Sequence, residues 1–521
     1  MTRSHDFDVV VVGAGHNGLI AAAYLARSGV STLLVEARDT VGGTASSESF
    51  AGASVNVCNC DHAAFRSTPI MEELDLASHG LRYIDLEPSQ VNIDWTTGRA
   101  WTLHHELEPT LASLSQAHPD SVDDYRRYVS TLLPVAKLVL AAALSTPSRG
   151  SLVSTVIRRG GLGARSLLRI SRMSAADVMR DFFSNEAVIG PAMVEGPVVW
   201  GVSPETPGTG LGALSYAMRH AVRVGRPVGG SGALIESLRD SFLSAGGMLR
   251  TSTKVTGILC EGASVAAVQM SDGTTVTAEV VIAACDPRRT FVSWLKNPPA
   301  RAASLVASWK ERQLQEGYES KIDAVTTMLP ALRSAPGHAG ASHDIGRLPG
   351  STHVVSPSLS ELHRGSLLMA EGRTMPRMAL LANSPSSLDD SLAPAGRHVF
   401  SLEAIFTPYG FSAGWDDRTE PERWLSQWQD LVEPGFIDSI IDWRVHTPKS
   451  YEEQFHLPKG HATSFAGGPL STLLGRDREL TRHTTPVTGL YLTGAATFPG
   501  AGIWGASGRN VARLVQRHIG R

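Results

Sequence analysis

Three glycines near the N-terminus have the spacing that brings a protein backbone against a phosphate group. Gly13, Gly15 and Gly18 form a G-x-G-x-x-G pattern directly after a run of valines. In this pattern the first glycine allows a tight turn, the second lets the backbone approach a pyrophosphate, and the third lets a helix pack on a strand. Glu36 follows at the distance where a carboxylate accepts hydrogen bonds from a ribose. The pattern predicts a dinucleotide site.

These residues need a strand–turn–helix unit to position them. Val9–Val12 predicts a buried strand, Leu19–Ala26 predicts a helix that ends at Gly29, and Thr32–Val35 predicts a second strand. The start of that helix offers free N–H groups and a positive dipole end to a phosphate.

A second glycine-rich helix start lies near the C-terminus. Leu490–Thr493 predicts a short strand, and Ala506–His518 predicts a final helix. Five glycines accompany the passage from strand to helix: Gly494, Gly500, Gly502, Gly505 and Gly508. An ordinary connection needs fewer, so we expect a second close approach of the backbone to a bound group.

Residues 227–291 hold a third motif, in which a helix is followed by hairpins. Leu234–Ser244 predicts a helix, and Val280–Ala284 predicts a buried strand. Between them, alternating segments meet at two turn signals, Glu261–Gly262 and Asp272–Gly273.

Together these motifs resemble the phytoene desaturase-like branch of the flavin-dependent amine oxidase superfamily. The resemblance rests on an N-terminal E-A-R-x-x-x-G-G extension and on a C-terminal G-x-x-x-x-P-G-x-G pattern that runs from Gly494 to Gly502. It implies FAD as the cofactor and an FAD-dependent dehydrogenase, desaturase or oxidase. The implied FAD-binding residues are Gly13, Ala14, Gly15, Gly18, Glu36, Ala37, Arg38, Gly42, Gly43, Thr44, Val255, Gly494, Ala495, Gly502 and Ile503.

The resemblance also implies an α/β fold, in which a discontinuous Rossmann-like FAD-binding domain carries an inserted α+β substrate domain. We assign residues 1–75, 220–290 and 455–521 to the FAD-binding domain, and residues 76–219 and 291–454 to the substrate domain. The first inserted piece is expected to be mainly helical, as in Asp120–Ala143. The second should contain a sheet, as in the alternating segment Arg397–Phe406.

Two residues are candidates for the reaction centre. His62 lies in the segment after Gly42 and Gly43, which should pass close to the flavin, so we predict a general base or a polar pocket residue. Trp504 lies in the C-terminal glycine loop and is predicted to form a wall of the substrate pocket. A hydrogen-bonded buried histidine and a packed indole are the alternatives.

The sequence leaves more than one function open. The first is dehydrogenation of a partly apolar organic substrate, which introduces C=C or C=N by hydride transfer to flavin N5. A flavin amine oxidase is an alternative, although Trp504 alone suggests the aromatic pair that often flanks the flavin in such enzymes. A non-catalytic flavoprotein scaffold is an alternative from another class.

Composition limits the other possibilities. The chain has 521 residues, of which 42% are hydrophobic and 19% charged, which suffices for two or three domains. A net charge of −3 gives no reason to expect a nucleic-acid partner. The four cysteines lack C-x-x-C spacing, so we expect no metal site. Without a recognisable leader pattern, a cytoplasmic location is expected.

Residues 154–178 mix five arginines with aliphatic residues. One interpretation is peripheral contact with a membrane, or the rim of a tunnel for a lipophilic small-molecule substrate. The other, slightly favoured, is a solvated helix pair with its arginines outward.

Overall fold

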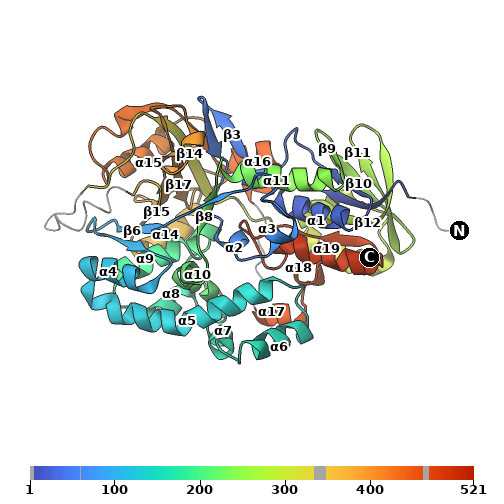
Figure 1. The fold of residues 1–521 in the computed structure, drawn as a ribbon, viewed down its shortest axis with the longest axis horizontal. Helices are drawn as coiled ribbons and strands as arrows, with labels where there is room; N and C mark the ends of the chain where they lie inside the picture. Colours follow the sequence, from blue (N-terminus) through green and yellow to red (C-terminus); the bar gives the residue numbers. More distant parts are fainter. Residues whose placement is uncertain (1–4, 59, 334–347, 462–468, 521) are drawn as a thin grey trace.

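The chain folds around two large sheets that lie toward opposite ends of an elongated molecule (Figure 1). The computed structural model describes residues 5–58, 60–333, 348–461 and 469–520. This arrangement confirms the expected Rossmann-like α/β fold with a second α+β region.

The first sheet carries the N-terminal motif. Its strand order is β13-β10-β11-β12-β1-β2-β9, and β19 pairs with β12. The central strands are parallel, whereas β10, β11 and β12 form an antiparallel meander. The strand bounds are β1 Phe7–Val12, β2 Thr32–Val35, β9 Met248–Arg250, β10 Val255–Glu261, β11 Ser264–Met270, β12 Thr275–Ala283, β13 Leu295–Lys296 and β19 Leu490–Leu492.

Three helices from distant parts of the chain pack together on this sheet. They are α1 (His16–Arg27), α11 (Ser231–Ser244) and α19 (Ala506–His518). Their apolar faces and the buried side chains of Val9 and Val11 form one core. The valine run of β1 is apolar throughout because other elements cover both faces of a central parallel strand.

The second sheet has the order β18-β14-β17-β16-β15-β6-β7. Its bounds are β6 Gln90–Asp94, β7 Ala100–Leu103, β14 Glu319–Thr326, β15 Thr352–Ser356, β16 Ala379–Asn383, β17 His398–Ile405 and β18 Ile440–His446. Strands β6 and β7 come from the first inserted piece, although the sequence indicated a sheet only in the second. The residues of β6, QVNID, alternate between polar and apolar over five positions, which is a strand pattern.

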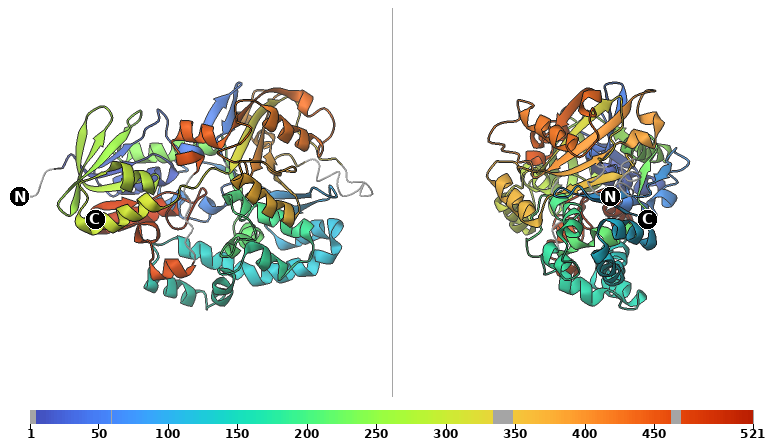
Figure 2. Two further views of the ribbon diagram at one scale, coloured as in Figure 1. Left: turned by 180° about the vertical axis from the view of Figure 1, so that it is seen from behind. Right: turned by 90° about the vertical axis from the view of Figure 1, so that its left-hand side faces the viewer.

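A layer of helices lies beneath the second sheet (Figure 2). It comprises α4 Leu107–Ala117, α5 Val122–Ala143, α6 Arg149–Arg158, α7 Ala164–Ile170, α8 Ala175–Arg180, α9 Glu186–Val194 and α10 Ser215–Ala221. Buried Trp101, Tyr125 and Tyr216 join this layer to the sheet. Among the described residues, no helix combines the length and the apolar character needed to cross a bilayer.

The described residues also form further strands and α-helices. They are β3 Ser47–Phe50, β4 Ala53–Asn56, β5 Tyr83–Asp85, β8 Gly225–Pro227, α2 Ala63–Arg66, α3 Ile70–Glu73, α12 Ala303–Glu311, α14 Leu359–Ala370, α15 Thr419–Gln429, α16 Pro448–Phe455, α17 Pro469–Leu474 and α18 Arg478–Thr481.

Candidate active site

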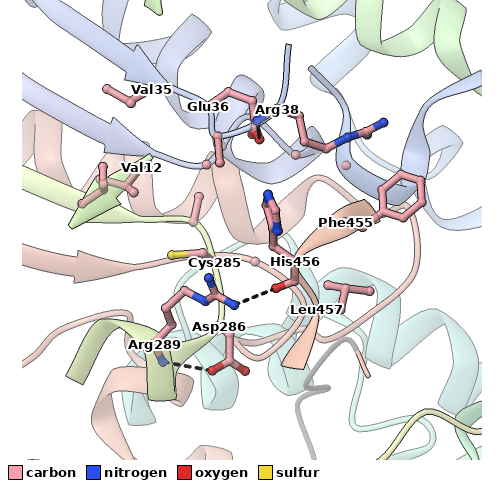
Figure 3. Close-up of a pocket in the computed structure, with 18 of the residues that line it drawn as sticks. Val12, Val35, Glu36, Arg38, Cys285, Asp286, Arg289, Phe455, His456 and Leu457 are labelled. Atoms are coloured by element: carbon pink, nitrogen blue, oxygen red, sulfur yellow. Dashed lines mark hydrogen bonds between the residues drawn. The ribbon is translucent and has the colours of Figure 1, made fainter. Parts of the chain in front are cut away.

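A cavity of about 580 Å³ lies at the carboxyl ends of β1, β2, β12 and β19, where α1 begins (Figure 3). Ligands of open parallel sheets bind at this edge. Twelve of the predicted FAD-binding residues line it: Gly13, Gly15, Gly18, Glu36, Ala37, Arg38, Gly42, Gly43, Thr44, Val255, Gly494 and Ala495. Ala14, Gly502 and Ile503 are outside this lining.

The three N-terminal glycines have different surroundings. A Cβ on Gly13, where φ is +101°, would lie 2.9 Å from the carbonyl oxygen of Ala284. A Cβ on Gly18 would lie 2.0 Å from the carbonyl oxygen of Gly13. A Cβ on Gly15 would meet nothing within 4 Å. Gly13 and Gly18 are therefore needed to build the turn, whereas Gly15 leaves open space above it.

Glu36 joins the end of β2 to the glycine turn. Its carboxylate accepts hydrogen bonds from the backbone N–H of Ala14 at 2.7 Å and of Arg38 at 2.9 Å. A carboxylate has about four acceptor positions, so two remain for ribose hydroxyl groups.

Replacing Glu36 with alanine should weaken FAD binding by about 1.5–3 kcal/mol, the range for hydrogen bonds to a charged group. Fluorescence titration of the apoprotein with FAD measures this change. Glu36→Gln keeps one acceptor oxygen and should fall between wild type and Glu36→Ala. If Glu36→Ala binds FAD as tightly as wild type, the residue is not part of the site.

The guanidinium group of Arg38 is suited to bind a pyrophosphate. Its Nη2 lies 3.3 Å from Glu48, and its guanidinium group lies over the ring of Phe455, 4.3 Å from the centroid. Its buried Nη1 has no hydrogen-bond partner in the described part of the chain. A buried, unsatisfied guanidinium nitrogen beside the open space at Gly15 suits a phosphate oxygen. The residues present therefore fit FAD, which would lie with its pyrophosphate between Gly15 and Arg38.

Part of the cavity wall comes from residues for which the sequence predicted no contact with the cofactor. Cys285, Asp286 and Arg289 follow β12, and His456 follows α16 (Figure 3). The Arg289 guanidinium donates to the carbonyl oxygen of His456 at 3.2 Å, and the Arg289 N–H donates to Asp286 at 3.1 Å. No spacing rule connects these segments, because they meet only in the folded chain.

The C-terminal glycine loop brings two indoles together. A Cβ on Gly502 would lie 3.5 Å from Cδ1 of Trp504 and 3.7 Å from Cη2 of Trp200. Trp200 is 41% exposed. His16, at the start of α1, is hydrogen-bonded to the backbone of Gly502, which joins this loop to the N-terminal motif.

A third aromatic ring, from the residue before β14, lies next to Gly201. A Cβ on Gly201, next to Trp200, would lie 2.5 Å from the ring of Tyr318. The Tyr318 ring in turn packs edge-on against His461, which lines the cavity. Trp504, Trp200 and Tyr318 thus lie near one another but outside the cavity lining, and the role of Trp504 as a wall of the substrate pocket stays a prediction.

His62 is fully buried and lies outside the cavity lining. Its Nδ1 is 2.8 Å from the hydroxyl of Tyr83, and its Nε2 is 3.1 Å from the hydroxyl of Ser231. Burial lowers the pKa of His62 to about 3. Both ring nitrogens are engaged, and the ring is neutral at neutral pH. The role of His62 as a base stays a prediction.

Two carboxyl groups on the second sheet form a pair that no sequence motif indicated. Glu403 on β17 lies opposite Lys321 on β14, and Glu319 lies two residues before Lys321 on the same face. Lys321 and Asp323 are 2% and 0% exposed, whereas Glu319 and Glu403 keep partial contact with solvent. The two carboxyl groups therefore lie at the partly exposed edge of a buried group of charges that includes Lys321 and Asp323.

Lys321 does not neutralise this pair. Its ammonium group binds Asp323 and donates to the carbonyl oxygen of Asn56 at 2.8 Å. Burial raises the pKa of Glu319 to about 7, although the thiol of Cys58 donates to it at 3.7 Å. Burial and the nearby Glu319 raise the pKa of Glu403 to about 8. At neutral pH the pair shares a proton and can accept another from a bound molecule.

A chain of ion pairs connects the cavity with this sheet. Glu48 lies 3.3 Å from Arg38 and 2.9 Å from Arg444. Arg444 lies 3.5 Å from Asp323, which binds Lys321. The charges therefore run without interruption from the pyrophosphate position to the strand that carries Glu319.

Comparisons with known proteins agree with this geometry. Residues 11–74 match the NAD(P)-binding Rossmann-like domain, and residues 103–319 match the flavin-containing amine oxidoreductases. Over 99% of its length the chain is 28% identical to mouse "Pyridine nucleotide-disulfide oxidoreductase domain-containing protein 2", of which the match covers 94%. It is 24% identical to phytoene desaturase (lycopene-forming) of Pantoea ananas, with 96% of each chain covered.

A solved structure of a putrescine oxidase triple mutant superposes with a TM-score of 0.64 at 17% identity, over 99% of each chain, and this likeness concerns the fold. No group of three or more histidine, cysteine, aspartate or glutamate residues in the described ranges could hold a metal ion. These matches identify the chain as an FAD-dependent oxidoreductase that is similar to the phytoene desaturase-like branch of the flavin-dependent amine oxidase superfamily.

Proposed function

We propose that this protein dehydrogenates a partly apolar organic substrate held between the aromatic wall of Trp504, Trp200 and Tyr318 and the Glu319–Glu403 pair. The observation that carries the proposal is the position of this carboxyl pair. Glu319 directly follows Tyr318, whose ring packs against His461 in the cavity lining. FAD, when bound, supplies the two-electron acceptor and takes hydride at N5.

The protein orients the substrate, excludes water from it and accepts a proton. In this proposal the fifteen FAD-binding residues predicted from the sequence hold the cofactor, in the domain formed by residues 1–75, 220–290 and 455–521. Residues 76–219 and 291–454 form the substrate side. Trp504 and its neighbours exclude water and orient the bond to be broken. The ionised carboxylate of the pair accepts the proton that leaves the substrate, and the other carboxyl group keeps the proton that the pair shares.

Oxidation of an amine is a second candidate. The indoles of Trp200 and Trp504 and the phenol of Tyr318 present aromatic faces next to two carboxyl groups. This combination attracts a protonated amine through cation–π and ionic interactions. The desaturase reading is favoured because the carboxyl pair holds a proton at neutral pH, which weakens its attraction for a cation.

Anaerobic flavin spectroscopy tests the proposal. Acid precipitation should first release FAD into the supernatant, and dithionite should bleach the bound flavin. We then expect neutral cyclic or polyunsaturated hydrocarbons and alcohols to bleach it, and primary amines to leave it oxidised. Bleaching by amines alone would establish amine oxidation. A flavin that dithionite reduces but neither substrate set changes would favour the scaffold. The cytoplasmic location stays a prediction.

A further inference from the structure

An exposed apolar surface lies on α6 and α7, away from the cavity residues. Val153, Ile157, Leu162 and Leu168 are 52%, 70%, 66% and 49% exposed. They occupy one short stretch of chain that includes the turn between the two helices. Helix α17, which contacts both helices and ends at Leu474, adds another side chain that is 43% exposed. Exposed apolar side chains gathered in this way mark an interaction surface.

The charged side chains of this surface are positive. Residues 144–176 contain six arginines and no aspartate or glutamate, in a chain whose net charge is −3. Arg158, Arg159, Arg165 and Arg172 are exposed. Arg169 alone among the exposed arginines of this stretch forms an ion pair within the described residues, with Asp181 at 2.7 Å. The surface therefore presents uncompensated positive charge around apolar side chains.

A groove of about 800 Å³ between α5 and α6 has the same character. Its apolar lining includes Val129, Leu133 and Leu162, and its basic lining includes Lys137 and Arg159. Apolar residues flanked by arginine and lysine suit a layer of hydrocarbon beneath anionic head groups.

We propose that the α6–α7 surface docks this protein on an anionic phospholipid bilayer, with Ile157 and Leu162 entering the interfacial layer. A second copy of the chain is a poor occupant, because a two-fold interface would place arginine against arginine. The proposal goes beyond the function proposed above, because it concerns residues outside the cofactor and substrate sites.

Co-sedimentation of the full-length, FAD-loaded protein with vesicles tests the proposal. We expect binding to vesicles of phosphatidylcholine with phosphatidylglycerol, weak binding to phosphatidylcholine alone, and loss of binding at high salt. The double variant Ile157→Ser with Leu162→Ser should bind at least about tenfold more weakly. Arg158→Gln with Arg159→Gln should lose a similar factor, since each basic residue near such a surface contributes about fivefold.

Matched controls change residues of similar exposure elsewhere. Leu243→Ser with Leu367→Ser, whose leucines are 42% and 53% exposed, should bind like wild type. Arg364→Gln with Arg397→Gln should do the same. All variants should keep their flavin and melting temperature, because the changed side chains are exposed.

Three results would overturn the proposal. These are equal binding by the Ile157–Leu162 variant and wild type, failure of wild type to bind anionic vesicles, and a concentration-dependent dimer that the Ile157–Leu162 variant abolishes.

Discussion

Replacing Gly15 with valine should give a folded protein that holds no FAD. The backbone of Gly15 has φ −65° and ψ 167°, which valine adopts without strain. A Cβ there meets no protein atom within 4 Å, so the folded chain can accommodate the branched side chain. That side chain would occupy the space through which the backbone approaches the pyrophosphate. We expect FAD affinity to fall by more than about a thousandfold, or about 4 kcal/mol.

The flavin absorbance of the purified variant and titration of its apoprotein measure this effect, and circular dichroism checks the fold. Gly18→Val is the matched control, because its Cβ would overlap the carbonyl oxygen of Gly13 and should destabilise the turn itself. A Gly15→Val protein with a full complement of flavin would show that this turn does not hold the pyrophosphate.

Glu403→Gln should slow substrate-driven flavin reduction by about 10²–10⁴-fold, the range for loss of a general base. The wild-type rate should rise with pH through the range where the pair ionises, between about 7 and 8. The variant should lose most of that rise. Rapid-mixing spectroscopy over pH 5–9 measures both, roughly spanning the ionisation of such a pair.

Although Glu403→Gln should reduce flavin more slowly, we expect it to be more stable than wild type at alkaline pH. The folded-state pKa of Glu403 is raised, so folding is favoured where the carboxyl is protonated, and this stability is lost as pH rises from about 4.5 toward 8. Glutamine stays neutral, so Glu403→Gln should melt at a higher temperature than wild type near pH 9 and at a similar temperature at acidic pH. Slower reduction by a more stable protein excludes misfolding as the cause.

His62→Ala provides the comparison between two candidate bases. If His62→Ala slows flavin reduction across the pH range while Glu403→Gln reduces flavin at the wild-type rate, the histidine is the base. The opposite pattern assigns the role to the Glu319–Glu403 pair.

Local sequence signals predicted the cofactor half of the protein well. The predicted strand Thr32–Val35 and the predicted helix Ala506–His518 have the observed bounds. The helix predicted from Leu19 begins earlier, at His16, because the turn residues after Gly15 already adopt helical geometry. These elements are predictable because glycine spacing and apolar runs act over short stretches of chain.

The proposed substrate side depends on contacts between residues that are far apart in the sequence. Glu319 and Glu403 approach only because β14 and β17 pair in one register, and a carboxyl group has no local signal for that pairing. Trp200, which comes from the first inserted piece of the chain, lies next to Gly502, as does Trp504. Sequence patterns therefore predicted the elements around the cavity, whereas the residues proposed for the substrate side have no local signal.

The continuous chain of charges from Arg38 to Lys321 makes the two halves thermodynamically linked. A phosphate on the Nη1 of Arg38 would offset part of the positive charge that holds Glu48 at Nη2, so Glu48 would bind Arg444 more strongly and weaken the contact of Arg444 with Asp323. That change alters the field at Glu319 and Glu403. Linkage is reciprocal, so protonation of the carboxyl pair must shift the affinity for FAD by the same factor by which FAD shifts the protonation.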